Sequence, residues 1–485
     1  MLVEGARCVG KSTVVEEFAR REYRSYILVD FAEASRDVHE LFDDVSDLDY
    51  LFLQLQLRYS ARLFDRESLI IFDEVQMCLR VRRAIKQLVK DGRYDYIGTG
   101  SLVSIRRNTR DILIPSEEER AQMRPMDFEE FLWARGDDAT VPLLRRAFAS
   151  RRPLGERLNR RLMRDFRFYM LVGGMPQAVD ALLRTNDLRA VDDVKRVIID
   201  LYEEDMHKIS PSGVLSMLFD AIPAQLAKKS LRYHVSSVLA GRRSQDILEQ
   251  IVQLEDSRTV LIARHTDDPN AGLSSSVDLG KFKLYLADTG LFVALAFKDA
   301  DFTGNIVYGK LLSDKLPVNL GMVYENVVAQ ELTAHGRRLF YHTWPKPGTT
   351  RNYEIDFIVP DGKKVSPVEV KSSNYRTHAS LDAFCGKCSS RVGRRHLVLH
   401  QGPGRGRRPS TASRPTCPCS CRERHGDGGP DRRDDARGTV HHLPMSKRGF
   451  NEDGLNHFDA ESSLDKQFMH EILAMVLVIQ SGTIG

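Results

Sequence analysis

A nine-residue stretch near the start of the chain has the composition of a loop that binds phosphate groups. Its sequence, GARCVGKST, fits the pattern G-x-x-x-x-G-K-[ST]. Its residues are Gly5, Ala6, Arg7, Cys8, Val9, Gly10, Lys11, Ser12 and Thr13. Glycine permits a tight turn that brings backbone N–H groups close to phosphate oxygens, and the N-terminus of a following helix attracts the same negative charge. We expect Lys11 to reach the β- and γ-phosphates of ATP and the Ser12 hydroxyl to coordinate Mg²⁺. The alternative is a glycine-containing turn before an ordinary helix.

Two further groups of polar residues follow apolar runs, as ATP hydrolysis requires. The run LIIFDE ends in Asp73 and Glu74, about 60 residues after the loop. A buried strand delivers such acids to the carboxyl edge of a parallel sheet. We predict that Asp73 holds Mg²⁺ and that Glu74 polarises the attacking water. Thr99 or Ser101, in the stretch GTGS, is predicted to bind the γ-phosphate or this water, although a small-residue turn has the same composition.

Several arginines come next in the sequence, and one of them is a candidate arginine finger. They are Arg106, Arg107, Arg110, Arg120 and Arg124, with Arg120 as our candidate. Such a residue stabilises the transition state from the same subunit or from a neighbouring one. Each of these arginines is individually also compatible with a solvated surface charge.

A second constellation of acidic residues lies towards the end of the chain. Asp356, in EIDFIV, is followed thirteen residues later by Glu369 and Lys371, in PVEVKSS. Residues two apart on a strand share one side, so Glu369 and Lys371 are expected on the same face. Asp356 and Glu369 would share a metal ion, with Glu325 as a further ligand and Lys371 stabilising developing charge. This pattern is loose, and a module that recognises nucleic acid or protein without cleaving is the alternative.

The order of the apolar patterns predicts the elements that position these residues. Residues 1–136 alternate short strands with helices, which predicts a parallel α/β sheet with helices on both faces. Its strands are expected at 26–31, 68–74 and 94–101. Residues 137–305 read as mainly helical, with a hinge at 172–176 and a winged-helix outline over 222–265. Residues 306–400 return to a mixed pattern, with a helix at 320–336 and strands at 339–344, 353–360, 365–373 and 394–400.

These motifs together resemble one family of prokaryotic AAA-type ATPases. The stretches that carry the resemblance are GARCVGKST, LIIFDEVQ, YIGTGS, ILIPSEEERAQMRPMDFEEFLWA, YMLVGGMPQAV, KFKLYLADTGLF and LGMVYENVVAQEL. The resemblance extends from residue 1 to about residue 398. It implies a P-loop ATPase core, a helical and winged-helix middle region, and a restriction-endonuclease-like end domain, and it implies no particular substrate.

Two segments depart from the pattern of that family. Only MLVE precedes the loop, so we expect the sheet to lack part of its leading element. Residues 401–445 are low in complexity and rich in Arg, Gly and Pro, and the interpretations are an Arg-rich nucleic-acid tail, a disordered linker or out-of-frame translation, which we favour. A zinc site at Cys385 and Cys388 with Cys417, Cys419 and Cys421 is disfavoured because Pro418 interrupts it. Residues 446–485 form a tail without a predicted role.

The bulk composition limits the class of protein. The chain has 485 residues, 42% of them hydrophobic and 28% charged, with a net charge of +4. Neither an apolar run near 18 residues nor a secretory signal is present, so we expect a cytoplasmic protein without a membrane span. We predict a Mg²⁺-dependent ATPase acting on nucleic acid or another protein, with oligomerisation possible. The rivals are a non-catalytic binding protein, or an inactive truncated or frameshifted copy, and a metal-dependent nuclease.

Overall fold

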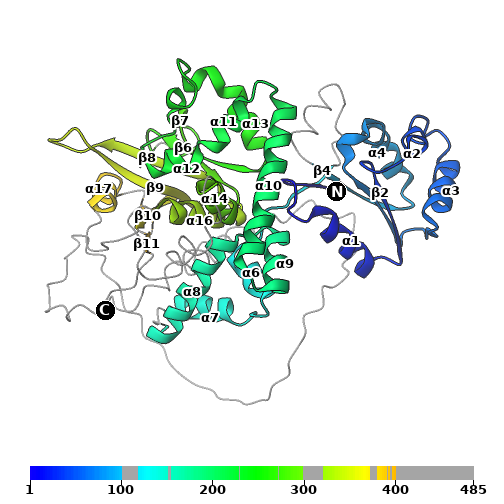
Figure 1. Cartoon of the computed structure of the whole chain (residues 1–485), viewed down its shortest axis with the longest axis horizontal. Coiled ribbons are helices and arrows are strands. Elements are labelled where there is room, and N and C mark those ends of the chain that lie inside the picture. The colour runs from blue at the N-terminus through cyan, green and yellow to red at the C-terminus, as the bar shows by residue number, and fades with distance from the viewer. Residues whose placement is uncertain are drawn as a thin grey trace, which may run out of the picture.

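The computed structural model describes most of the chain up to residue 399 (Figure 1). The described residues are 1–100, 118–150, 154–228, 230–270, 272–298, 321–371, 379–389, 392–393 and 396–399. Ser101, three of the candidate arginines (Arg106, Arg107 and Arg110) and the late cysteines Cys417, Cys419 and Cys421 lie outside this part. So do the segments predicted at 401–445 and 446–485.

The N-terminal part is a five-stranded parallel sheet in the order β2-β3-β4-β1-β5. Its strands are β1 (Leu2–Glu4), β2 (Ser25–Asp30), β3 (Ser68–Asp73), β4 (Asp95–Gly100) and β5 (Arg120–Gln122). The connecting helices are α1 (Lys11–Glu22), α2 (Arg36–Glu40), α3 (Leu48–Tyr59), the 3₁₀ turn η1 (Val75–Met77) and α4 (Leu79–Asp91). The prediction of a parallel α/β sheet is confirmed, and all six residues of β3 are buried, as its apolar run indicated.

The three residues ahead of the phosphate loop form the strand β1 inside this sheet. Leu2 pairs with Gly98 of β4 on one side and with Arg120 of β5 on the other. We expected the sheet to lack part of its leading element, but Leu2–Glu4 is paired along both edges. The strand β5 was not predicted from sequence, because three residues, RAQ, carry too little pattern.

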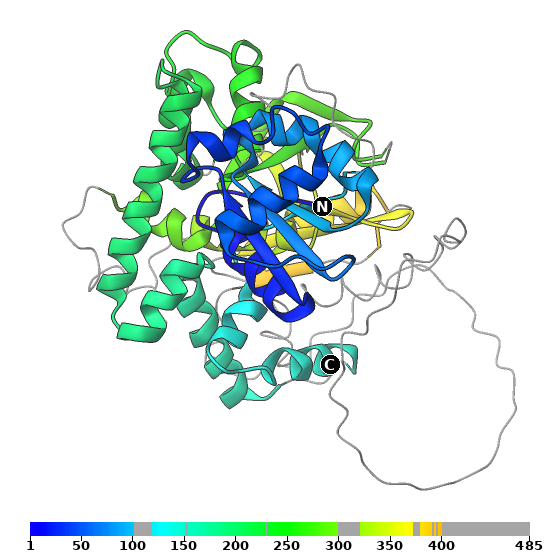
Figure 2. The ribbon, with the colours of Figure 1, turned by 90° about the vertical axis from the view of Figure 1, so that its right-hand side faces the viewer.

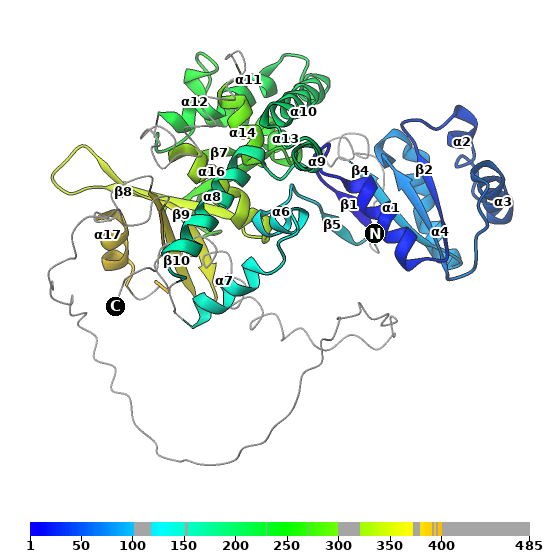
Figure 3. The same cartoon turned by 60° about the horizontal axis from the view of Figure 1, so that its bottom comes forward.

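A helical region follows and occupies the middle of the molecule. Figures 1 and 3 show α9 and α10 between the two sheets. The helices are α6 (Phe128–Ala134), α7 (Thr140–Ala149), α8 (Glu156–Val172), α9 (Pro176–Thr185), α10 (Leu188–Ile209), α11 (Val214–Asp220), α12 (Ile222–Ala227), α13 (Leu248–Asp256), α14 (Thr289–Ala296) and α16 (Gly321–Ala334), with 3₁₀ turns η2 (Val235–Ser237) and η3 (Ser244–Ile247).

The second sheet has six strands in the order β11-β10-β9-β8-β6-β7. These strands are β6 (Val260–Thr266), β7 (Val277–Leu286), β8 (Leu339–Pro345), β9 (Asn352–Asp361), β10 (Lys364–Lys371) and β11 (His396–Leu399), with helix α17 (Ala379–Lys387) after β10. Figure 2 shows this sheet behind the N-terminal one. The predicted small α/β end domain is confirmed as a fold.

The antiparallel pair β6–β7 continues into this sheet, because β6 also pairs with β8 in parallel. The domain boundary predicted near residue 305 therefore divides one sheet. The helices and hairpin of the predicted winged helix occur in the expected order, as α12, α13 and β6–β7. A winged-helix function for them stays a prediction. Within the described residues, no helix combines the length and apolar character that crossing a bilayer needs.

Three glycines allow separate backbone segments to touch at the centre of the molecule. A Cβ atom on Gly174 would lie 1.9 Å from the carbonyl oxygen of Met126, and one on Gly290 would lie 2.3 Å from that of Val172. At Gly173, whose φ is +82°, a Cβ would lie 2.2 Å from the Asp288 carboxylate. Close packing thus requires these glycines. We had predicted a hinge at residues 172–176, but in the structure these residues are part of a packed junction.

Buried hydrogen bonds join the same segments. The Met126 N–H donates to the carbonyl of Gly174 over 2.8 Å, and the Tyr169 hydroxyl donates to the carbonyl of Met126 over 2.7 Å. The Gln330 amide donates to the Tyr169 hydroxyl over 2.8 Å. The motifs that carry the family resemblance therefore meet at one packed junction.

Substituting Gly174 with alanine tests this junction. The added methyl group has no space beside Met126, so Gly174→Ala should lower the free energy of unfolding by about 3 kcal/mol. Gly386→Ala is the control, because no atom lies within 4 Å of a Cβ placed there. Chemical denaturation of both variants measures the effect. Equal stability of the two variants would show that the junction tolerates a side chain.

Candidate functional site

The phosphate loop connects the carboxyl end of β1 to the first residue of α1. Cys8 and Gly10 have positive φ angles of 65° and 91°, so the loop uses left-handed backbone twice within three residues. A Cβ atom on Gly5 would lie 2.5 Å from the carbonyl oxygen of Met123. The structure therefore explains both glycines of the motif. Gly10 adopts a left-handed backbone conformation, and Gly5 leaves no space for a side chain.

Lys11 is folded onto the loop that it belongs to. Its ammonium donates to the carbonyl of Ala6 over 2.9 Å and to that of Gly5 over 3.3 Å. Burial lowers the pKa of Lys11, while the nearby carboxylates of Glu74 and Asp73 act in the opposite direction. The lysine is thus directed to the carboxyl edge of the sheet, where a nucleotide phosphate would compete for its ammonium.

Asp73, Glu74 and Thr99 meet at the ends of the neighbouring strands β3 and β4. The buried Thr99 hydroxyl donates to Oδ1 of Asp73, and the Glu74 N–H donates to the same oxygen over 3.1 Å. These bonds orient the Asp73 carboxylate at the sheet edge. The fold thus brings Thr99 to the acidic pair, and its predicted role at the γ-phosphate or the attacking water stays a prediction.

Glu74 has two unusual properties for a glutamate. Its φ of 51° lies in the left-handed region that non-glycine residues rarely adopt. Burial raises the pKa of Glu74, while Lys11 and a hydrogen bond from Gln76 lower it. Backbone strain and a shifted pKa are both common at functional positions.

The donor atoms present suit a magnesium ion bound with ATP. Ser12 is half-buried at the start of α1, and Asp73 is buried and accepts the Thr99 hydroxyl and the Glu74 N–H at one carboxylate oxygen, Oδ1. Hydroxyl and carboxylate oxygens are hard ligands of the kind that Mg²⁺ prefers. Ser12 and Asp73 would hold the ion, which would neutralise charge on the phosphates.

The helical region contacts the phosphate loop directly. The Tyr202 hydroxyl, on α10, donates to the carbonyl of Arg7 over 3.0 Å. Val9 is completely buried within the hydrophobic core of the helical region, together with Ala6. Tyr202 was missed from sequence, because in an amphipathic helix a tyrosine on the buried face looks like any core residue.

Arg120, the candidate arginine finger, lies on β5. Its guanidinium is 3.3 Å from a carboxylate oxygen of Glu4 and 3.1 Å from one of Glu118. These ion pairs hold it against the edge of its own sheet. Its catalytic role stays a prediction. To act as an arginine finger on a neighbouring subunit, the Arg120 side chain would have to leave Glu4 and Glu118.

The acids of the C-terminal constellation lie on adjacent elements. The register that pairs Phe357 with Val368 brings Asp356 opposite Glu369 on β9 and β10, and Glu325 lies on α16. Asp356 accepts a hydrogen bond from the Val370 N–H over 2.7 Å. Burial and the neighbouring acids Glu325 and Glu354 raise its pKa well above the ordinary value. The side chain of Lys371 lies outside the described part of the structure.

A different lysine, Lys283 of β7, lies among these acids. Its buried ammonium is 2.6 Å from Oε1 of Glu354 and 3.7 Å from Oε2 of Glu325. Burial alone would lower the pKa of Lys283, but Tyr285, Glu354 and Glu325 outweigh it and hold the pKa above its ordinary value. Lys283 is therefore a built-in cation in this acidic cluster. It lies in the stretch KFKLYLADTGLF, but nothing in that stretch indicated this role.

The predicted metal ligands do not converge as a set. In the described ranges, only Asp127, Glu331 and His335 bring three ligand atoms within 4.8 Å of one another. Those two carboxylates already cap α6, since Asp127 accepts from the Glu130 N–H over 2.9 Å and Glu331 accepts from the Phe128 N–H over 3.1 Å. Their place at the start of α6 is explained by capping.

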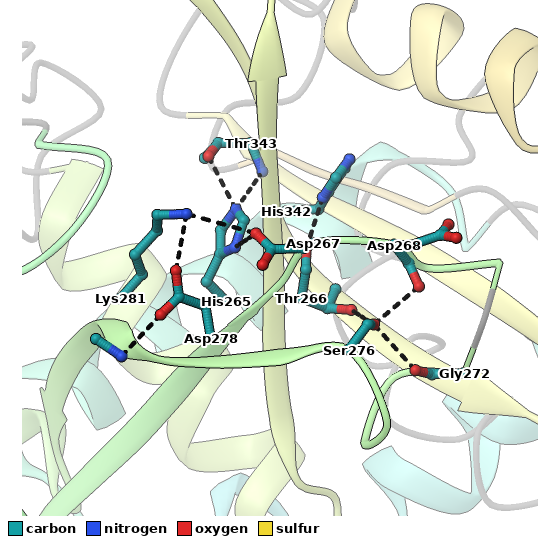
Figure 4. A network of polar contacts seen from close by, with 11 residues as sticks. His265, Thr266, Asp267, Asp268, Gly272, Ser276, Asp278, Lys281, His342 and Thr343 are labelled. Atoms are coloured by element: carbon teal, nitrogen blue, oxygen red, sulfur yellow. Dashed lines mark hydrogen bonds and ion pairs between the residues drawn. The ribbon is translucent and has the colours of Figure 1, made fainter.

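The second sheet also carries a polar network around two histidines (Figure 4). His265 Nε2 accepts from the Thr343 N–H over 3.1 Å, and its Nδ1 lies 3.1 Å from Asp267. Lys281 joins Asp267 and Asp278 at 3.4 and 2.8 Å. Burial lowers the pKa of His265, so the network ties β6, β7 and β8 together with a neutral imidazole.

Comparison with known proteins identifies the N-terminal part. Residues 1–132 match a family described as an AAA domain. This match supports an AAA-type P-loop ATPase domain in this part of the chain. Residues 163–301 and 320–413 match two domains of unknown function, DUF8612 and DUF4143. The nuclease-like character that we predicted for the end domain therefore stays a prediction.

One solved structure and the curated proteins complete the comparison. The structure of the Aeropyrum pernix Orc1 protein in complex with DNA is similar at 15% sequence identity and a TM-score of 0.26, covering 61% of this chain and 86% of that chain. No curated protein matches the chain.

Removing Lys283 tests its role as the internal cation. Lys283→Met leaves Glu354 and Glu325 without their counter-charge, so the free energy of unfolding should fall by about 3 kcal/mol at neutral pH. The loss should shrink as the pH falls and these carboxylates take up protons. Lys298→Met, which breaks the more exposed pair with Glu203, should cost less than about 1 kcal/mol. Denaturation at several pH values measures both variants, and equal losses would contradict the assignment.

Proposed function

We propose that the chain is a Mg²⁺-dependent ATPase that couples its nucleotide state to the helical region and the C-terminal module. The observation that carries this proposal is the meeting of Lys11, Asp73, Glu74 and Thr99 at one sheet edge beside the phosphate loop. A sheet edge of this kind is where α/β proteins bind their ligands.

Each residue has a distinct part in the proposed reaction. The loop N–H groups and Lys11 bind the β- and γ-phosphates of ATP, which releases the lysine from the carbonyls of Ala6 and Gly5. Thr99 keeps Asp73 oriented, and Ser12 and Asp73 hold the magnesium ion. Glu74 accepts a proton from the attacking water, and its raised pKa brings the carboxylate closer to the pH at which a general base works best.

The contact of Tyr202 with the loop supports the coupling. Phosphate binding at N–H groups of residues 5–13 changes the position or rigidity of a backbone that α10 holds at the Arg7 carbonyl. Val9 adds an apolar contact between the loop and the same helical core. A shift of the loop is therefore transmitted to α10 through packed atoms.

For the C-terminal module we propose recognition of nucleic acid or another protein rather than cleavage. Lys283 already compensates Glu354 and Glu325, which leaves less negative charge to attract a divalent metal ion. The neighbouring pair Asp356 and Glu369 supports the nuclease alternative. Metal-dependent cleavage of DNA or RNA that is lost in Asp356→Ala would favour that alternative.

Two substitutions test hydrolysis at the phosphate loop. Lys11→Ala should weaken ATP binding at least tenfold because the buried ammonium is lost. Glu74→Gln should keep ATP binding while turnover falls by about 10²-fold or more, since an amide cannot accept the proton. Binding by fluorescent nucleotide titration and phosphate release together measure these effects.

Lys90→Ala, which changes an exposed lysine of α4, is the matched control and should behave as the parent protein. Wild-type protein that releases no more phosphate than Glu74→Gln in the presence of Mg²⁺ would remove the ATPase proposal. Binding of ATP without turnover would then leave the non-catalytic binding protein as the better description.

Tyr202→Phe tests the coupling separately from the chemistry. The substitution keeps the buried ring but deletes the hydrogen bond to Arg7, which is worth about 1 kcal/mol. We expect ATP affinity to fall about fivefold while turnover at saturating ATP is retained. We also expect ATP to alter hydrogen exchange in α10 less than in the parent. An ATP response of α10 that equals that of the parent would contradict this route.

A further inference from the structure

A cavity of about 670 Å³ lies away from the phosphate loop, where three parts of the chain meet. It is bounded by the segment after β5, by the turn between α13 and β6, and by the turn between α16 and β8. Five arginines line it, and they are Arg124, Arg258, Arg264, Arg337 and Arg338. This volume lies within the range of sites that bind small molecules.

Among the described residues that line the cavity, arginines outnumber acidic residues. Glu255 is the single acidic residue among the described residues that line it, and it pairs with Arg264 over 2.7 Å. Arg124 donates to a neutral partner, the Gln122 side chain, over 2.7 Å. The Nε atoms of Arg124 and Arg258 are buried without a hydrogen-bond acceptor among the described residues. Burial and the adjacent charge of Arg258 lower the pKa of Arg124.

Arg258 holds its position at a cost to the backbone. Its φ is 61°, in the left-handed region, one residue beyond Ser257, the C-cap of α13. Glycine is the usual residue at such a position, because it adopts this conformation without steric conflict. Arg258 could also interact with the carbonyl groups at the C-terminus of α13. That role alone would not explain why Arg124 lies close to it.

We propose that this cavity binds a small phosphorylated molecule that carries at least two negative charges and an apolar part. Guanidinium groups bind phosphate oxygens through paired hydrogen bonds, and the Nε atoms of Arg124 and Arg258 have no acceptor among the described residues. Leu261, Leu279 and Phe340 supply apolar surface in the same cavity. The bound molecule would connect the segment leaving the first sheet to β6 and β8 of the second.

The test uses the full chain carrying Lys11→Ala, which weakens binding at the phosphate loop. The comparison between cavity variants in this background does not depend on the ATPase proposal. Binding is measured by isothermal titration calorimetry. Tripolyphosphate is the first probe, and ATP, which adds an aromatic base to the phosphates, is the second. Arg258→Gly should reduce the affinity for both probes at least tenfold. It should not lower the melting temperature, since glycine suits the left-handed backbone.

Arg66→Gly is the matched control, because Arg66 also has a φ of 61° and lies in the N-terminal part, distant in sequence from every residue of the cavity. It should bind both probes as the parent does. Arg124→Gln is a second test within the cavity and should give a loss of similar size.

Unchanged affinity in both Arg258→Gly and Arg124→Gln would overturn the proposal. So would binding of a short single-stranded oligonucleotide that is lost in these variants while tripolyphosphate and ATP do not bind. That result would assign the arginines to a nucleic-acid surface.

Discussion

The close approach of three backbone segments at Gly173, Gly174 and Gly290 is the constraint on which the rest of the structure depends. The Asp288 carboxylate lies between these segments, accepting the Gly174 N–H over 2.5 Å and the Leu291 N–H over 2.8 Å. Burial raises the pKa of Asp288, and the N–H groups and Lys195 offset part of that effect. A side chain at Gly174 would clash with the Met126 carbonyl and one at Gly290 with the Val172 carbonyl, while one at Gly173 would clash with the Asp288 carboxylate.

The phosphate loop is supported by both the first sheet and the helical region. β1 and α1 belong to the first sheet, whereas Ala6 and Val9 pack in the core of the helical region and Tyr202 binds the Arg7 carbonyl. Most of a nucleotide-binding loop faces solvent or ligand when its domain stands alone, so burial of Val9 by another region is informative. The helical region acts as part of the loop's support, and any change in the loop geometry is opposed by packing in that region.

Sequence patterns predicted the elements and motifs well, and the contacts between distant elements poorly. The apolar run before Asp73 and Glu74, about 60 residues after the phosphate loop, indicated a central strand, and β2, β3 and β4 lie where we expected them. Strands of three residues, such as β5, carry too little periodicity to be recognised. The membership of β6 and β7 in the second sheet depends on pairing with β8, more than 70 residues later, which a local pattern cannot reveal. Lys283 and Tyr202 were missed for the same reason, because their partners are remote in sequence.

Charge compensation distinguishes three of the polar regions of the described structure. In the acidic cluster, Lys283 supplies a cation from within the fold, so the carboxylates are partly neutralised without any ligand. In the phosphate loop, Lys11 contacts only neutral carbonyls at hydrogen-bond distance, and its charge is balanced from further away by Glu74 and Asp73. In the arginine-lined cavity, Glu255 is the one acid among the described lining residues and it is already paired. Buried charge without a nearby counter-charge is costly, and a bound anion relieves that cost. At the phosphate loop and in the arginine-lined cavity, a bound phosphate would therefore add negative charge next to side chains that carry positive charge.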